Sequence, residues 1–235
     1  MLVAAAVCPC PPLLVPAVAA GAAPELADAR TACSDALAVL AASRPDRLVV
    51  VGPAAVDGRG VHPAGSAGSF AGFGVDLTVR LGSGPGGERP LPASLAVAAW
   101  LLEQTGWADA PVEGLGVGEE LESARCAAAG REIAAAADRV ALLVMGDGSA
   151  CRTLKAPGYL DERAEGFDAA AARALGTADT AALLALDAEL AQALQAAGRA
   201  PWQVLAGAAE GAGLEGRLLH EGAPYGVGYF VAAWS

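Results

Sequence analysis

Three short runs of apolar residues constrain the fold of this chain more than any other feature. They span residues 2–7, 48–51 and 140–145, and none of them alternates with polar residues. A strand with this pattern is buried on both faces, which is typical of a sheet covered by helices on both sides. Helical spacing of apolar residues in the segments between the runs supplies such helices. We therefore predict an α/β fold with a mixed or parallel central sheet flanked by helices.

The remaining segments extend this alternation to the end of the chain. Strands are also predicted at residues 75–81, 112–116, 216–220 and 226–234, and helices at residues 24–42, 92–104, 119–138, 160–174, 180–197 and 201–211. Residues 54–74 are rich in glycine and small polar residues and are expected to form a long loop, with a flexible break at 82–92. No repeat or linker divides the chain, so a single domain is predicted over residues 1–235.

Charge and hydropathy exclude several classes of function. The formal net charge is -11, which repels phosphate backbones, so nucleic-acid binding is not expected. No apolar stretch approaches the roughly 18 residues of a membrane helix, and a proline cluster at residues 9–16 interrupts the apolar start. The five cysteines are scattered without CxxC spacing, which favours reduced thiols. We therefore expect a cytoplasmic protein that acts neither on nucleic acid nor at a membrane.

A glycine-rich segment after a predicted strand satisfies the GxGxxG pattern of dinucleotide-binding proteins. Its glycines are Gly82, Gly84 and Gly87. A phosphate site needs a helix that opens at the third glycine, and Pro90 and Pro92 delay any helix here. We therefore interpret this segment as a surface turn.

The segment GDGS at residues 146–149 follows the third apolar run and is the best local candidate for a polar pocket. Its glycines let backbone amides approach a ligand, and Asp147 and Ser149 supply hydrogen-bonding side chains. Lys155 or Arg152, a few residues further on, could pair with an anion. The alternative is an Asx-type turn that leads into a loop.

Cysteine and histidine offer further candidates. Cys8 and Cys10 lie where the first strand ends, a position at which α/β sheets place ligand contacts. A thiol there could bind a metal or react, but we favour a structural role, because free cysteine commonly serves as a small buried hydrophobe. His62 is expected in the long loop and His220 in a late strand or turn. We interpret these as a solvated loop histidine and a turn histidine, not as a catalytic pair.

Five segments occur in the order found in one known family. They are AAAVCPCPPLL, LVVVGPAA, VMGDGSA, GRAPWQVL and GVGYFVAAW. They resemble, in turn, the first strand with its CPHPP-type exit, the second strand, the SGDLSH-type turn, a helix start and the closing strand of the LigB-like class III extradiol dioxygenases. The Memo-like proteins share this fold. The resemblance spans nearly the whole chain and implies one LigB-like domain over residues 1–235.

The resemblance also implies where the family's iron(II) ligands and its acid–base histidine would lie. The first histidine position is Cys10, and the second is at about Ala55. The histidine of the SGDLSH-type turn corresponds to Ala150, and the ligand position before GRAP corresponds roughly to Ala197. Alanine has no lone pair to donate, so no iron cofactor is predicted and ring cleavage is expected to be absent. His62 would act as a substitute ligand only if its loop shifted.

Three functional hypotheses remain open at this point. The leading one is a metal-free relative that binds a small molecule or a protein partner in its strand-end cleft, without a cofactor. The second is an enzyme of changed, metal-free chemistry built from Cys10, Asp147, Ser149 and Lys155. The third is an extradiol dioxygenase, an oxidoreductase, that holds Fe(II) with displaced ligands. Because small members of the family often pair, the resemblance also implies that the chain could form a homo-oligomer.

Overall fold

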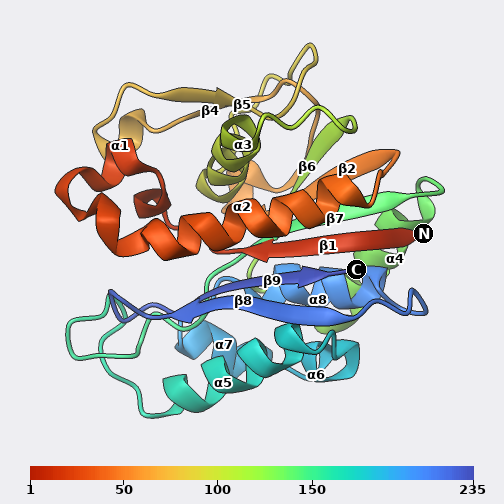
Figure 1. Ribbon diagram of the computed structural model, residues 1–235. Coiled ribbons are helices and arrows are strands. Elements are labelled where there is room, and N and C mark those ends of the chain that lie inside the picture. The colour runs from red at the N-terminus through yellow and green to blue at the C-terminus, as the bar shows by residue number, and fades with distance from the viewer.

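A mixed seven-stranded sheet forms the centre of the computed structural model, which describes residues 1–235 (Figure 1). In order across the sheet, the strands are β3 (Gly60–His62), β6 (Val112–Val117), β2 (Arg47–Pro53), β7 (Val140–Met145), β1 (Leu2–Cys8), β9 (Tyr229–Trp234) and β8 (Gly216–Gly222). The four inner strands β6, β2, β7 and β1 run parallel to one another. Strand β3 at one edge and strand β9 next to β1 run antiparallel to their neighbours. The predicted α/β class with a mixed central sheet is confirmed.

Helices cover both faces of this sheet. One face carries α1 (Pro16–Ala19), α2 (Ala27–Ala42) and α3 (Ala93–Thr105). The other face carries α4 (Ser123–Ala135), α5 (Arg163–Gly176), α6 (Thr180–Leu184), α7 (Ala188–Ala193) and α8 (Arg199–Ala208). Short 3-10 helices occur at Pro12–Leu14, Ala20–Leu26, Val56–Gly58 and Ala71–Phe73. The two layers explain why the strands β1 and β7 are apolar at every position.

Strand β1 illustrates this burial on both faces. Ala4, Ala6 and Cys8 pack into the hydrophobic core on the α2 and α3 side, whereas Ala5 and Val7 pack into the core on the α8 side. Successive side chains of a strand point to opposite faces, so a strand between two helical layers needs apolar residues at each position. The two cores thus account for the unbroken apolar runs in the sequence.

The predicted helix at residues 180–197 is wrong as a single element, because the chain forms α6 and α7 there. Each of these helices begins after an aspartate that caps it. The Asp179 carboxylate accepts a hydrogen bond from the backbone N–H of Ala182 at 2.9 Å, and the Asp187 carboxylate accepts one from that of Leu190 at 2.9 Å. An aspartate side chain that binds backbone amides favours a helix start over a helix interior.

Residues 54–74 are also more ordered than predicted. They contain β3 and the strand β4 (Ala67–Ser69), and β4 pairs with β5 (Thr78–Arg80) in a separate two-stranded sheet. Strands of three residues are too short for a periodic apolar pattern to reveal them. The predicted surface turn at Gly82–Gly87 is confirmed as a loop without a helix.

Two glycines allow α4 and α8 to pack with their backbones in contact. A Cβ atom on Gly130 of α4 would clash with the Val204 carbonyl oxygen, and one on Gly207 of α8 would clash with the Ala127 carbonyl oxygen. Only glycine leaves room for helix backbones to approach so closely. This contact holds the helical layer that lies below β2 and β7 in Figure 1.

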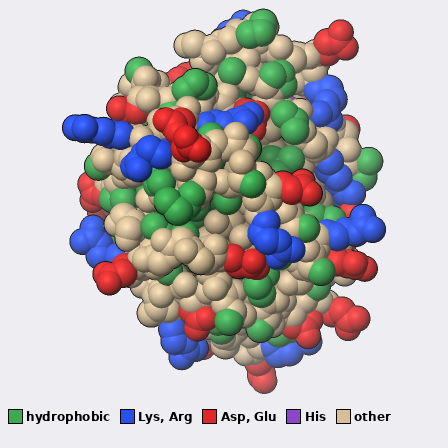
Figure 2. Space-filling view, turned by 90° about the vertical axis from the view of Figure 1, so that its right-hand side faces the viewer, with side chains coloured by type: hydrophobic (Ala, Val, Ile, Leu, Met, Phe, Trp, Pro, Cys, Tyr) green, Lys and Arg blue, Asp and Glu red, His purple; other side chains and the backbone are tan.

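The surface at the amino ends of the inner strands carries charges of both signs (Figure 2). Basic side chains are interspersed with aspartate and glutamate side chains on this face, and hydrophobic side chains lie in small groups.

None of the helices combines the length and the apolar character needed to cross a membrane. All five cysteines are buried and none is in a disulfide.

Candidate functional site at the strand ends

The carboxyl ends of the four inner strands meet at one edge of the sheet, on the left in Figure 1. The chain leaves β1 through Cys10, β2 through Ala55, β6 through Glu119 and β7 through Asp147. Strand β9 is antiparallel, so its first residue, Tyr229, begins at this same edge. Open α/β sheets place their ligand sites outside the carboxyl ends of parallel strands. This edge is therefore the candidate functional site.

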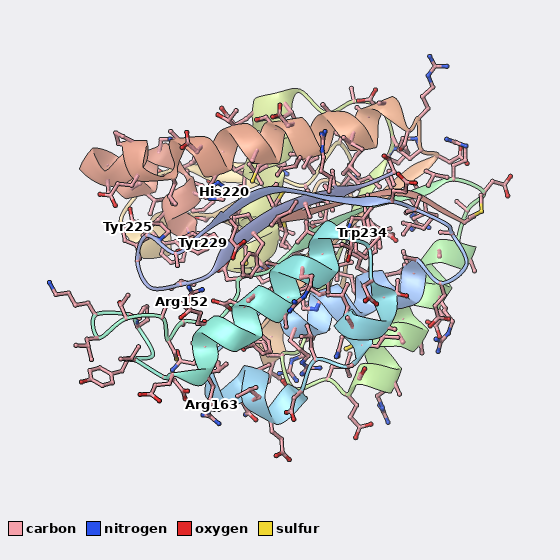
Figure 3. The ribbon with its side chains drawn as sticks, turned by 60° about the horizontal axis from the view of Figure 1, so that its bottom comes forward. Arg152, Arg163, His220, Tyr225, Tyr229 and Trp234 are labelled. Atoms are coloured by element: carbon pink, nitrogen blue, oxygen red, sulfur yellow. The ribbon has the colours of Figure 1, made fainter.

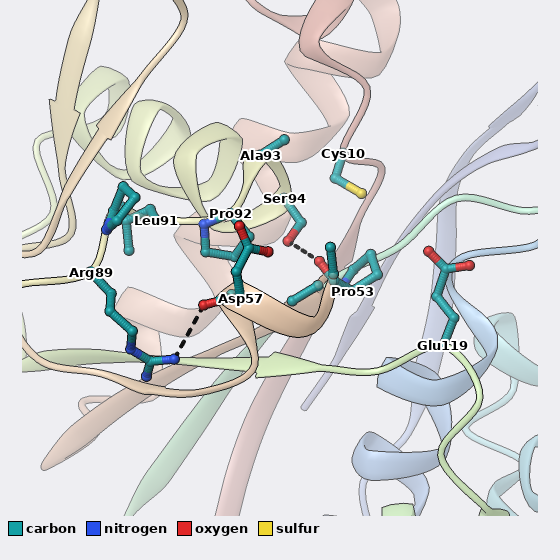
Figure 4. A pocket seen from close by; sticks show the side chains of 13 residues that line it. Cys10, Pro53, Asp57, Arg89, Leu91, Pro92, Ala93, Ser94 and Glu119 are labelled. Carbon is teal, nitrogen blue, oxygen red and sulfur yellow. Dashed lines mark hydrogen bonds between the residues drawn. The ribbon is translucent and has the colours of Figure 1, made fainter. Parts of the chain in front are cut away.

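A cavity of about 620 Å³ opens at this edge (Figure 4). Cys10 and Ala55 both lie on its wall, beside Glu119 from the end of β6. The rest of the wall comes from the stretch that follows β2 and from residues 89–94, which lead into α3. A cavity of this volume with a largely small and apolar lining suits a small-molecule ligand.

Cys10 and Asp147 are in direct contact beside this cavity. The backbone N–H of Cys10 donates a hydrogen bond to Asp147 Oδ1 at 2.8 Å, and the Cys10 thiol donates weakly to Asp147 Oδ2 at a distance of 3.8 Å. Burial raises the pKa of the Asp147 carboxyl to about 7, although the two hydrogen bonds from Cys10 act in the opposite direction. The two residues come from separate sequence motifs, and the fold brings them together.

The Cys10 thiol stays protonated at neutral pH. Burial is the main reason that its pKa lies well above the usual value, and the negative charges of Asp147 and Glu119 raise this pKa further. A thiol is a much weaker nucleophile and metal ligand than a thiolate. The cavity therefore presents Cys10 as a hydrogen-bonding group.

Tyr229 is a member of this site that the sequence did not reveal. Its ring is buried at the start of β9, and its hydroxyl forms no hydrogen bond to another protein group. Burial and the nearby Asp147 carboxyl raise the pKa of the Tyr229 phenol. Figure 3 shows Tyr229 and Tyr225 at the same end of the β8–β9 hairpin. Sequence patterns do not show that β9 pairs with β1, so they could not place Tyr229 here.

Ser149 belongs to a buried network and not to the cavity wall. Its backbone N–H and its hydroxyl donate to the two carboxylate oxygens of Asp168 at 2.7 and 2.8 Å. The Arg152 guanidinium donates to Asp168 Oδ2 at 3.1 Å. Ser149 and Asp168 are both fully buried. The two loop residues Ser149 and Arg152 are thus tied to Asp168 on α5, and the Ser149 hydroxyl is used in this buried network.

Lys155 lies apart from the site. It is exposed in the loop between β7 and α5 and forms no ion pair, and the Tyr159 side chain in the same loop is 63% exposed. Neither residue lines the cavity. Of the polar candidates in residues 146–159, only Asp147 contacts Cys10.

The four positions singled out by the resemblance are not all on the cavity wall. Ala55 lines the cavity with Cys10. Ala197 directly precedes Gly198, whose backbone N–H donates to the Asp147 carbonyl oxygen at 2.8 Å. Ala150 is buried, and its backbone N–H donates to the Leu194 carbonyl oxygen at 2.8 Å. One thiol and three methyl groups do not form a donor set that fits an iron ion.

The expectation for His62 is wrong, because it is a buried strand residue and not a solvated loop residue. It ends β3 with only 1% of its surface exposed, and its Nε2 lies 2.8 Å from the Gly58 carbonyl oxygen. The ring is therefore held by a backbone group and does not line the cavity. His220 lies on β8 opposite Val231, in the strand position predicted as one of its two alternatives. No group of three or more His, Cys, Asp or Glu side chains is arranged to hold a metal ion.

Arg199 positions the loop that carries Glu119. Its guanidinium is buried at the start of α8 and donates to the carbonyl oxygens of Glu119 and Leu121 and to Gln203 Oε1. The predicted helix at 119–138 begins only at Ser123, so Glu119 lies in the loop after β6. An arginine fork satisfies several oxygen atoms at fixed angles and holds such a loop in place. The sequence carried no signal for this long-range contact.

Comparison with known proteins defines the fold alone. No protein-family model matches the chain, and no curated protein matches it. Among solved structures, the fold is similar to that of the uncharacterized protein JW3007 from Escherichia coli K12, with a TM-score of 0.54 and 15% sequence identity over 99% of each chain. The chain therefore shares its α/β fold with this bacterial protein over 99% of its length.

Proposed function

We propose that this chain is a metal-free relative of the LigB-like and Memo-like proteins that binds a small molecule in the strand-end cavity. The observation that carries the proposal is the 620 Å³ cavity, with Cys10 and Ala55 on its wall. These are two of the positions at which the resemblance implies metal ligands. A metal site needs converging donors, and alanine supplies none. A cavity that keeps its place in the fold without such donors favours binding over ring cleavage.

A thermal-shift screen against a library of small molecules tests this proposal. We expect some compounds to raise the Tm of the wild-type protein and to leave the Tm of Ala55→Trp unchanged, because the indole would occupy the cavity. Ala42→Trp is the matched control, since Ala42 is exposed at the end of α2, before β2 begins, and the cavity wall lies where β2 ends. Compounds that stabilise wild type and Ala55→Trp equally would place binding elsewhere and overturn the proposal.

Iron loading tests the dioxygenase alternative. The protein would be supplied with Fe(II) without oxygen, desalted and analysed for bound metal, and its oxygen uptake with catechol would then be measured. We expect less than stoichiometric iron and no turnover. Stoichiometric iron together with catechol cleavage would show that displaced residues hold the metal, and would overturn the metal-free proposal.

A metal-free enzyme is the second candidate, and the contact between Cys10 and Asp147 favours it. A carboxyl with a pKa of about 7 can both accept and donate a proton near neutral pH, which is the property of a general acid or base. If a ligand from the screen is converted, Asp147→Asn should abolish its conversion and Cys10→Ser should reduce it. Full conversion by Asp147→Asn would exclude this role.

A further inference from the structure

The side-chain donors on the cavity wall already have acceptors within the protein. The Arg89 guanidinium donates to the carbonyl oxygens of Arg59 at 2.7 Å, Val61 at 3.0 Å and Asp57 at 3.4 Å. The Ser94 hydroxyl donates to the Pro53 carbonyl oxygen at 2.7 Å (Figure 4). A ligand that presents only acceptors, such as a carboxylate, would have to compete with these contacts.

The two carboxylates on the wall, unlike these donors, have no partner within the protein. Neither the Asp57 nor the Glu119 side chain forms a hydrogen bond or an ion pair within the protein. Figure 4 shows Glu119 across the cavity mouth from Arg89, on the side of Cys10. Both side chains have unused acceptor capacity, so the wall offers anionic acceptors, whereas Nη1 and Nη2 of Arg89 and the Ser94 hydroxyl already donate to backbone carbonyl oxygens.

The wall carries two carboxylates, those of Asp57 and Glu119, against one guanidinium, that of Arg89, so its side-chain charge is negative. The amino end of α3 carries the positive end of the helix dipole, and Gly58, next to Asp57 in the chain, packs against Pro92 at this end. The Arg199 guanidinium lies beneath the loop of Glu119, with its N–H groups directed at carbonyl and amide oxygens. The net charge of -11 adds a long-range field that attracts cations.

We propose that the cavity binds a small organic cation, with a protonated amine at Glu119 and an aliphatic body against the apolar wall. Pro53, Ala54, Leu91 and Pro92 supply this wall. The amine brings the donors that the carboxylates lack, and the apolar body replaces water on the proline and leucine surfaces. This inference rests on the proposed binding function and names the class of its ligand.

Three probes with the same body and different charges test the inference. Cyclohexanemethylamine, cyclohexanemethanol and cyclohexanecarboxylate would be titrated into the protein at pH 7.5, with binding followed by ligand-observed NMR and confirmed by loss in Ala55→Trp. We expect the amine to bind about tenfold more tightly than the alcohol, since one charge-assisted hydrogen bond contributes roughly this factor. The carboxylate should bind most weakly.

Charge-neutral variants locate the amine. Glu119→Gln should weaken binding of the amine about fivefold to tenfold and leave binding of the alcohol unchanged. Asp57→Asn tests the second free carboxylate in the same way. Glu132→Gln is the control for net charge, because Glu132 is exposed on α4 and does not line the cavity. Amine binding that survives both Glu119→Gln and Asp57→Asn would overturn the inference.

The outcomes separate this inference from the function on which it rests. If the alcohol or the carboxylate binds as tightly as the amine and Ala55→Trp abolishes this binding, the cavity is a binding site but the cation preference is wrong. If none of the probes binds in the millimolar range and the library screen also fails, the binding function itself is wrong.

Discussion

The chemistry of Asp147 depends strongly on its surroundings. Its carboxyl accepts a hydrogen bond from Cys10 at the exit of β1, its backbone carbonyl accepts one from Gly198 just before α8, and burial raises the pKa of the carboxyl from 3.8 to about 7. Between these two pH values the unfolded chain has released the proton and the folded chain still holds it. The unfolded state therefore binds fewer protons, and the stability contributed by this residue falls as the pH rises from about 4 to 7.

Asp147→Asn should remove this dependence on pH. One pKa unit corresponds to about 1.4 kcal/mol, so the variant should gain at most about 4 kcal/mol relative to wild type between pH 4 and 7, and nothing more above pH 7. Urea unfolding of both proteins at several pH values measures the difference. An equal difference at all pH values would show that the Asp147 carboxyl is not shifted.

Asp161→Asn is a control of opposite sign. Hydrogen bonds from Arg163 lower the pKa of the Asp161 carboxyl to about 2. Its stabilising contribution is present above the unfolded pKa and is lost as the pH falls through about 2, so the difference between Asp161→Asn and wild type should change only below about pH 4.

The buried contact between Ser149 and Asp168 predicts a structural and not a functional phenotype. Asp168→Ala should destabilise the fold by about 3–5 kcal/mol, because it leaves the Arg152 charge without its buried partner. Ser149→Ala should cost about 1–3 kcal/mol, since one buried acceptor loses its hydroxyl donor. Chemical denaturation measures both. If the Ser149→Ala protein had wild-type stability and altered ligand binding, Ser149 would have a role in the binding site and the structural interpretation would be wrong.

At the scale of elements, the packing of α4 against α8 depends on glycine. Gly130→Ala and Gly207→Ala should each destabilise the fold by about 1–3 kcal/mol or more, because the added methyl group forces the two backbones apart. Gly166→Ala on α5 is the matched control. No atom lies within 4 Å of its added Cβ, so this substitution should stabilise the protein by about 0.5–1 kcal/mol. Thermal unfolding distinguishes the expected decrease in stability of the first two variants from the expected increase for Gly166→Ala.

The elements also show which parts of the fold could be predicted from the sequence. The strand at residues 140–145 was predicted with the bounds of β7, because six apolar residues form one local pattern. The strands β3 and β4 were not predicted, since three residues are too few to show a periodic pattern of apolar side chains. The helix at 180–197 was predicted without its break, because Asp187 caps α7 through a single local hydrogen bond that an otherwise helical pattern hides.

At the scale of the whole molecule, the centre of the seven-stranded sheet should be more stable to local unfolding than the separate two-stranded sheet of β4 and β5. The backbone of β7 pairs with β1 on one side and β2 on the other, and all six of its residues are buried. Strands β4 and β5 pair only with each other. Amides of β7 should exchange hydrogen only through global unfolding, and amides of β4 and β5 through local opening at a far smaller free energy. Mass spectrometry of exchanged peptides measures both, and equal protection would contradict this order.

The candidate site could be predicted only in part. Cys10 and Asp147 were singled out separately, because each follows an apolar strand, and strand ends are where α/β sheets bind ligands. Glu119, Tyr229 and Arg199 were not singled out. Their part in the site depends on where β6, β9 and α8 lie relative to β1.

Local patterns in the sequence are enough to predict an α/β sheet with buried strands, because an unbroken apolar run is a local property that burial on both faces satisfies. The order of the strands across the sheet depends instead on contacts between distant segments. That order places Cys10 against Asp147, which lies 137 residues further along the chain. Strand pairing and the desolvation that shifts the pKa of Asp147 arise from contacts between distant segments, and no local pattern encodes them.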